Sequence, residues 1–170
     1  MTAVGATRRG VVELSCLSPH FTLAEMSVTR TGHSNVPPGP VVEHLIRLCE
    51  EILEPIRAEW GPVKVYSGYR SETVNSAVGG APNSAHRTGD AADFDTGRDL
   101  VGVYLFIMRS ALPIGQVILY PSRDFIHVSH REGTGFTCPF SRRALLSPSK
   151  GVYVPAAEGW RAVFGVGFPR

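Results

Sequence analysis

The sequence predicts one α+β domain in which N-terminal helices pack on a small, mostly antiparallel sheet. First, residues 40–56 place apolar side chains at three- and four-residue steps, with charged residues on the other side, as an amphipathic helix does. Second, residues 116–120 and 125–130 resemble two strands, and the four residues between them suit a hairpin. Third, the helical segments come mainly before the strands, which favours an α+β fold over a doubly wound one.

The first part of the chain leads into the long helix. Residues 1–14 are expected to form a flexible arm, and Phe21–Met26 a short packed turn before a loop rich in Gly, Asn and Pro at 31–39. Pro40 begins the amphipathic helix, since proline suits a first helical position. Pro55 is expected to kink this helix or to end its main part.

Shorter elements follow the long helix. Residues 63–67 alternate and predict a strand, and residues 71–78 predict a helix that is capped by a serine and stopped by two glycines. Residues 91–94 are expected to enter a strand. A second long helix is expected over residues 99–112, because Pro113 ends its apolar pattern.

The last part of the chain shows no periodicity. From Thr137 onward it mixes Pro, Gly, Arg and isolated aromatic residues. We therefore assign residues 15–136 to the domain and residues 137–170 to a C-terminal extension of unknown role. This extension either packs on the domain or serves as an attachment segment.

Composition excludes several classes of protein. The formal net charge of +2 is small and the basic residues are scattered, which argues against a nucleic-acid surface. The longest apolar stretch is too short to span a bilayer, and the opening residues lack the apolar core of a signal peptide. We therefore expect a chain that is made in the cytoplasm as a soluble protein.

The cysteines predict no covalent framework. Cys16, Cys49 and Cys138 are odd in number and far apart, so the sequence indicates neither a disulfide scaffold nor a cysteine-based zinc site. We expect all three to be buried thiols.

Two short segments carry the residue types of a catalytic metal site. His86 and Asp93 lie in the first segment, and Asp124 and His127 in the second. A catalytic zinc site keeps three protein ligands and leaves the fourth position to water, and these residues supply three ligands and one spare carboxylate. We expect His86 at the end of a loop, a turn at Gly89, and Asp93 inside a strand.

The remaining histidines and aspartates receive other interpretations. His130 lies on the strand face opposite His127 and is expected to be exposed. Asp90 and Asp95 are expected to be solvated, with the alternative that Asp95 orients a ligand histidine as an outer carboxylate. The histidines interpreted as structural or surface residues are His20, His33 and His44.

These motifs resemble those of the zinc murein peptidases, which include D-alanyl-D-alanine carboxypeptidases and dipeptidases and many phage endolysins. The family pattern Ser-x-His-x-x-Gly-x-Ala-x-Asp is met at every fixed position by residues 84–93, and the later acid-x-x-His by residues 124–127. Upstream, Ser67–Ser71 also look like the corresponding stretch of that family. The resemblance runs from roughly Ser18 to Ser129 and implies the D-Ala-D-Ala carboxypeptidase/hedgehog-like fold.

The resemblance also implies roles for individual residues. It implies that zinc is bound by His86, Asp93 and His127, and that Asp124 is the general base. The family usually has Glu at this last position. The shorter Asp withdraws the carboxylate by roughly 1.5 Å, the length of a C–C bond.

Two further residues are implied to contact the substrate. Arg70 is implied to hold a substrate carboxylate or the developing oxyanion, and Ser84 to support the same region.

The resulting hypothesis is a zinc-dependent peptidase that cuts a stem-peptide amide bond of peptidoglycan. We expect a phage lysin, either an endolysin or a virion-borne enzyme, that acts at the bacterial cell wall and contacts virion proteins through residues 137–170. The alternative is a virion structural or wall-binding protein that retains the zinc fold with little or no hydrolysis. A bacterial D-Ala-D-Ala peptidase is a third possibility.

Overall fold

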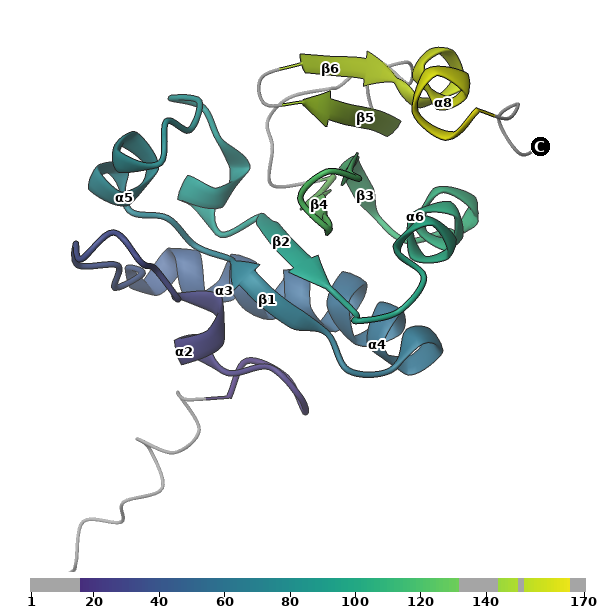
Figure 1. Cartoon of the computed structure of the whole chain (residues 1–170). Coiled ribbons are helices and arrows are strands. Elements are labelled where there is room, and N and C mark those ends of the chain that lie inside the picture. The colour runs from purple at the N-terminus through teal and green to yellow at the C-terminus, as the bar shows by residue number, and fades with distance from the viewer. Residues whose placement is uncertain (1–15, 132–143, 150–151, 166–170) are drawn as a thin grey trace, which may run out of the picture.

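The computed structural model describes residues 16–131, 144–149 and 152–165, which form one mixed sheet with helices packed against it (Figure 1). The sheet order is β1-β2-β4-β3-β5-β6. Its strands are β1 (Lys64–Ser67), β2 (Ala91–Asp95), β3 (Ile114–Tyr120), β4 (Phe125–His130), β5 (Ala144–Ser149) and β6 (Val152–Pro155). All neighbouring strands are antiparallel except β3 and β5, which are parallel. The predicted α+β class with a mostly antiparallel sheet is confirmed.

The helices are mostly those that the periodicity predicts. They are α2 (Leu23–Met26), α3 (Gly39–Leu48), the π-helical turn η1 (Cys49–Leu53), α4 (Glu54–Trp60), α5 (Glu72–Ala77), the 3-10 helix η2 (Ala85–Thr88), α6 (Leu100–Arg109) and α8 (Ala156–Phe164). Among these residues, no helix has the length and apolar character needed to cross a bilayer.

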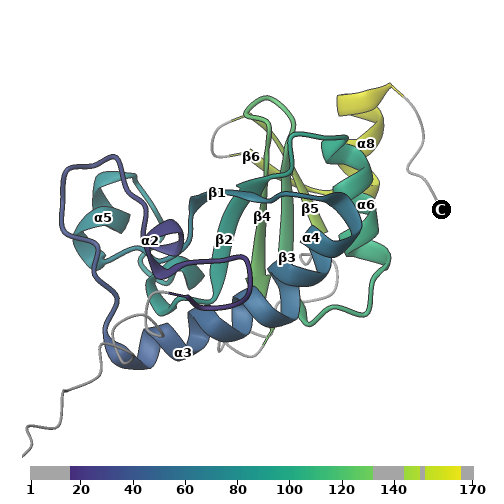
Figure 2. The same cartoon turned by 90° about the horizontal axis from the view of Figure 1, so that it is seen from below.

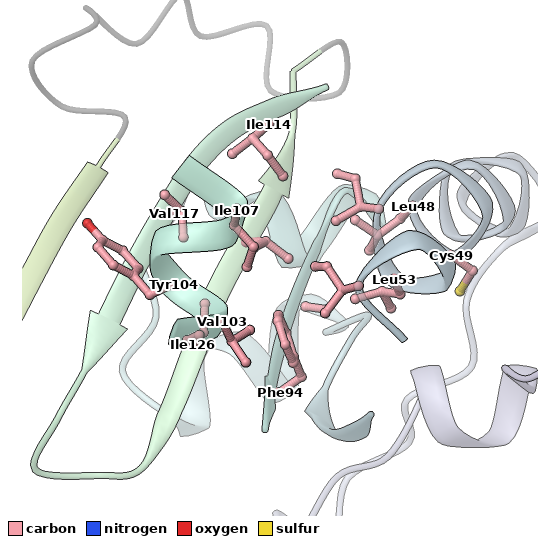
Figure 3. Close-up of a cluster of buried hydrophobic side chains, with 14 of the residues drawn as sticks. Leu48, Cys49, Leu53, Phe94, Val103, Tyr104, Ile107, Ile114, Val117 and Ile126 are labelled. Carbon is pink, nitrogen blue, oxygen red and sulfur yellow. The ribbon is translucent and has the colours of Figure 1, made fainter. Parts of the chain in front are cut away.

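The core lies between one face of the sheet and the helices. Helices α3 and α4 form one long rod beside the sheet (Figure 2). Figure 3 shows side chains from α3, η1 and α6 meeting Phe94 of β2 and Ile126 of β4, and both of these side chains are fully buried. Because strand side chains alternate between faces, Asp93 and His127 point to the opposite face. The same alternation along β2 and β4 therefore directs apolar side chains into the core and places Asp93 and His127 together on the other face of the sheet.

Pro55 does not end the long helix. The structure continues from α3 through η1 into α4, with Pro55 in the first turn of α4. Immediately before the proline, the Glu54 N–H donates to the Cys49 carbonyl, five residues back. A proline ring in a regular α-helix would collide with the carbonyl four residues earlier, and the wider π-helical turn occurs at this point. Of the two alternatives expected at Pro55, the end of the helix was wrong, and the regular α-helix is instead interrupted by the π-helical turn immediately before the proline.

Glu54 attaches the N-terminal segment to this helix. Its carboxylate accepts hydrogen bonds from the Ser18 hydroxyl (2.7 Å) and from the His20 backbone N–H (2.9 Å), and its other oxygen lies 2.8 Å from the His20 ring. Burial raises the pKa of Glu54, but the hydrogen bonds from Ser18 and His20 outweigh burial and lower the pKa below its ordinary value of 4.5. The ionised carboxylate therefore stabilises the fold.

We expect Glu54→Gln to lower the melting temperature at neutral pH by a few degrees. Hydrogen bonds to a charged group contribute about 1.5–3 kcal/mol, less when partly exposed, and about 1 kcal/mol corresponds to about 2–4 °C at this size. Because the folded-state pKa is depressed, this contribution is present above pH 4.5 and is lost as the pH falls further. Thermal unfolding from pH 7 to pH 3 should show the two proteins converging in acid, and a constant difference would contradict the assignment.

The described C-terminal elements join the sheet. Strand β5 pairs with β3, β6 pairs with β5, and the buried Trp160 of α8 stacks on Tyr104 with ring centroids 6.2 Å apart. None of these elements was predicted from the sequence, because their short segments have little periodicity of their own. The proposed domain boundary after residue 136 and the arm at 1–14 lie outside the described residues.

The cysteines are only partly as expected. Cys49 is buried, and burial raises the pKa of its thiol. The expectation for Cys16 was wrong, since this thiol is exposed where residue 16 forms an isolated bridge with Thr22. Cys138 lies outside the described residues.

Candidate metal centre

The structure brings together the three residues that were expected from the sequence to bind metal. His86 comes from η2, Asp93 from β2 and His127 from β4. The antiparallel register places Asp93 directly opposite His127. Gly89, with φ of 80°, ends η2 in the left-handed conformation and turns the chain toward β2, as its position in the motif predicted.

The spacing of the three ligand atoms fits a tetrahedral ion. His86 Nε2 lies 3.2 Å from Asp93 Oδ1 and 3.2 Å from His127 Nδ1, and the last two atoms are 2.8 Å apart. Zinc ligands at 2.0–2.1 Å in a tetrahedron are separated by about 3.3 Å. The residues present therefore fit a zinc ion, which is held by nitrogen and oxygen atoms of this kind.

A backbone carbonyl fixes the orientation of His86. Its Nδ1 lies 2.6 Å from the Gly68 carbonyl oxygen, which can only accept, so Nδ1 carries the proton and Nε2 presents its lone pair to the cluster. Burial lowers the pKa of His86 despite the opposing effect of Asp93, which favours the neutral form that a metal ligand requires. A Cβ at Gly68 would lie 2.5 Å from the Met26 carbonyl oxygen, so the upstream motif needs glycine there.

Arg70 contacts the carboxylate of Asp93. Its Nη2 hydrogen-bonds Asp93 Oδ2, and its Nε donates to the Ser67 hydroxyl at 2.7 Å. Burial raises the pKa of Asp93, but the neighbouring His86 and His127 outweigh burial and hold this pKa well below its usual range. The contact between Arg70 and Asp93 was not predicted from the sequence, because it depends on how the loop after β1 directs one side chain toward the other on β2.

Arg70 and Ser84 line the same pocket. Its volume is about 520 Å³, and its walls come from the loop after β1, from α5, from the loop between α5 and η2, and from η2. The pocket is therefore lined by both residues expected to contact substrate, one of which, Arg70, also contacts Asp93.

Asp124 lies in the turn between β3 and β4. It is exposed, and its φ of 52° is left-handed, a conformation that Asp and Asn adopt more readily than other side chains. Its carboxylate is outside the group formed by the three ligand atoms, but its charge contributes to raising the pKa of Tyr66, after burial and the charge of Asp95.

Asp90 was expected to be solvated, and this was wrong. Its carboxylate is fully buried and contacts two residues of α3, with His44 Nδ1 at 3.0 Å and Arg47 Nη2 at 3.5 Å. Its backbone N–H donates to the Ala85 carbonyl, and its own carbonyl accepts from the His130 N–H. Asp90 therefore ties η2, β2 and β4 to the long helix. The three-residue spacing of His44 and Arg47 was a signal for this contact.

We expect Asp90→Asn to destabilise the protein by roughly 2–3 kcal/mol. Loss of the negative charge leaves Arg47 half-buried without this partner, and such a loss costs about 3–5 kcal/mol for a fully buried pair. Urea unfolding of the metal-free protein measures the effect. The exposed Asp99→Asn is the control, and equal stability of the two variants would contradict the prediction.

His130 was also expected to be exposed, and this was wrong. Its side chain is buried, and its Nε2 lies 3.0 Å from a carboxylate oxygen of Glu51 on η1. The strand face opposite His127 is the core face, so alternation itself directs His130 toward the helix. Asp95 does not contact a ligand histidine through any described hydrogen bond, and its carboxylate accepts from the Gly97 N–H.

A comparison of the sequence with models of known protein families found a match that covers this candidate metal site. A family model described as peptidase M15 matches residues 19–129, which is more than half of the 170-residue chain. The matched residues include His86, Asp93 and His127 and end before β5 and β6. A search of the curated proteins found no match.

Proposed function

Because the chain belongs to the peptidase M15 family, we propose that it is a zinc-dependent peptidase that cuts an amide bond in the stem peptide of bacterial peptidoglycan. The family supports a metallopeptidase, and its members are typically zinc-dependent. The observation that carries the proposal is the tetrahedral spacing of His86 Nε2, Asp93 Oδ1 and His127 Nδ1.

The proposed chemistry divides between the metal and the chain. Zinc, when bound, supplies a Lewis acid that activates water and polarises the scissile carbonyl. Asp124 takes a proton from the attacking water and delivers it to the leaving amine. Arg70 and Ser84, which line the pocket beside the ligands, hold a substrate carboxylate or the developing oxyanion.

We further propose that the protein acts as a phage lysin at the cell wall, as an endolysin or carried on the virion. The likeness of residues 84–93 and 124–127 to phage endolysins supports this. If the enzyme is carried on the virion, the C-terminal residues from 137 onward contact virion proteins.

One observation favours the alternative of a wall-binding or virion structural protein with little hydrolysis. The position of the usual family glutamate holds the shorter Asp124, on an exposed turn. Binding of the protein to cell walls that persists after metal removal, without product release, would support this second function.

Digestion of purified peptidoglycan tests the leading proposal. We expect the zinc-loaded protein to release muropeptides with new amino and carboxyl termini, to lose this activity with a chelator, and to regain it with zinc. Mass spectrometry of the products also identifies the bond that is cut. Absence of cleavage across several wall types, by protein shown to contain zinc, would overturn the proposal.

A further inference from the structure

The Arg123 side chain lies over two aromatic rings of the β3–β4 hairpin, those of Tyr120 and Phe125, which together are called the aromatic platform. Its guanidinium carbon lies 4.9 Å from the ring centre of Phe125 and 5.6 Å from that of Tyr120. The two rings stack with centroids 4.3 Å apart. Such cation–π contacts hold the guanidinium over the rings although the residue itself is exposed.

The aromatic platform lies beside the metal ligands. Phe125 is on the same face of β4 as His127, two residues away. Burial, the Tyr153 hydroxyl and the charge of Asp93 raise the pKa of Tyr120, while the charge of Arg123 lowers it. The Tyr120 hydroxyl is therefore within electrostatic reach of both a metal ligand and Arg123.

A C-terminal strand supports this platform. Tyr153 of β6 meets Tyr120 edge to face, with centroids 6.3 Å apart and an interplanar angle of 87°, and the two hydroxyl oxygens are 3.4 Å apart. Tyr153 and β6 lie beyond residues 19–129, which the family model matches. The contact that supports Tyr120 therefore comes from outside the matched region.

The guanidinium groups of Arg123 and Arg70 have different partners. Arg70 is already bonded to Asp93 and Ser67. Within residues 16–131, 144–149 and 152–165, Arg123 makes contacts to aromatic rings but no ion pair. An exposed guanidinium that is held in place and keeps its hydrogen-bond donors is suited to bind a carboxylate in a bidentate manner.

We propose that Arg123 binds a carboxylate group of the stem peptide and makes the enzyme prefer substrates in which that group is ionised and not amidated. This inference rests on the proposed peptidase function. Two carboxylates share this chemistry, the α-carboxylate of the D-glutamyl residue and the C-terminal carboxylate.

Amidated peptides distinguish the two carboxylates. The substrates are a synthetic stem pentapeptide with both groups free, the same peptide amidated at the D-glutamyl α-carboxylate, and the same peptide amidated at the C terminus. Kinetics are compared for the zinc-loaded parent, Arg123→Gln and Arg123→Lys, with Arg161→Gln as the matched control on an exposed position of α8.

We expect Arg123→Gln to raise KM for the free peptide by about 10-fold with kcat within about twofold, since one charge-assisted contact contributes at least about 1.4 kcal/mol. One of the two amidated peptides should already have the high KM with the parent and show no further rise with the variant. Arg123→Lys should restore part of the effect, and Arg161→Gln should match the parent.

An equal rise in KM for all three peptides, or no rise for any, would overturn the assignment of Arg123. If the parent cleaves none of the peptides, the proposed function fails separately. The inference is then decided by calorimetric affinities of the same peptides for the parent and Arg123→Gln. A difference that depends on one carboxylate supports the inference, and its absence overturns it.

Discussion

Replacing His127 by alanine is expected to lower zinc affinity by at least about 100-fold and to abolish peptidoglycan hydrolysis. The substitution removes one of three ligand atoms that lie within 4.8 Å of one another and leaves His86 and Asp93. Changes to partners that only orient a ligand already cost roughly 10–100-fold in affinity, so loss of a ligand itself should cost more. Competition with a chromophoric chelator measures the affinity, and muropeptide release measures the activity.

Two controls separate this effect from loss of folding. His33→Ala changes an exposed histidine in the loop before α3 and should leave both affinity and activity unchanged. Far-ultraviolet circular dichroism of the metal-free His127→Ala protein should match the parent, because His127 lies on the face of β4 opposite the core. If His127→Ala retained the parent's zinc affinity, the three-residue site would be wrong.

The parts of the fold that the sequence predicted correctly are those set by local periodicity. The amphipathic pattern predicted the helix that begins near Pro40, and the spacing of two strand segments predicted the β3–β4 hairpin. Both depend on contacts between residues close in sequence. The pairing of β5 with β3 joins segments more than twenty residues apart in parallel, and no local pattern specifies such a partner.

The errors in the site have a common physical cause. Asp90 was expected to be solvated and His130 to be exposed, the latter because it lies on the strand face opposite His127, and both expectations treated a polar residue without a partner nearby in sequence as exposed. In the structure each finds a partner on the long helix, Asp90 with His44 and Arg47, and His130 with Glu51. A buried polar group is stable only when such a partner exists, and the partner comes from a distant part of the chain.

The ligand positions could be anticipated more fully than their surroundings. The motif implied which three side chains would meet, and the structure brings them together. The bond between His86 and the Gly68 carbonyl, and the contact of Arg70 with Asp93, depend on how the loop after β1 passes beside β2. Residue types in a motif do not contain this information.

Replacing Asp124 by asparagine is expected to lower kcat by about 100- to 10,000-fold, the usual contribution of a general base. Zinc affinity should stay within about threefold of the parent, because Asp124 lies outside the ligand group. Asparagine is close to aspartate in size and also tolerates the left-handed backbone at this turn, so the hairpin should persist. Steady-state kinetics on muropeptides, together with chelator competition, measure both quantities.

Asp124→Glu tests whether the length of the side chain or its fit to the left-handed backbone matters more for activity at this position. Glutamate extends the carboxylate by roughly 1.5 Å but fits the φ of 52° less well, at a cost of up to about 1–2 kcal/mol in stability. If Asp124 is the base, this variant should keep far more activity than Asp124→Asn, since an ionisable carboxylate remains in the turn. Equal rates for the parent and Asp124→Asn would show that the proton is taken by another group, whereas inactivity of all three zinc-loaded proteins would favour the wall-binding alternative.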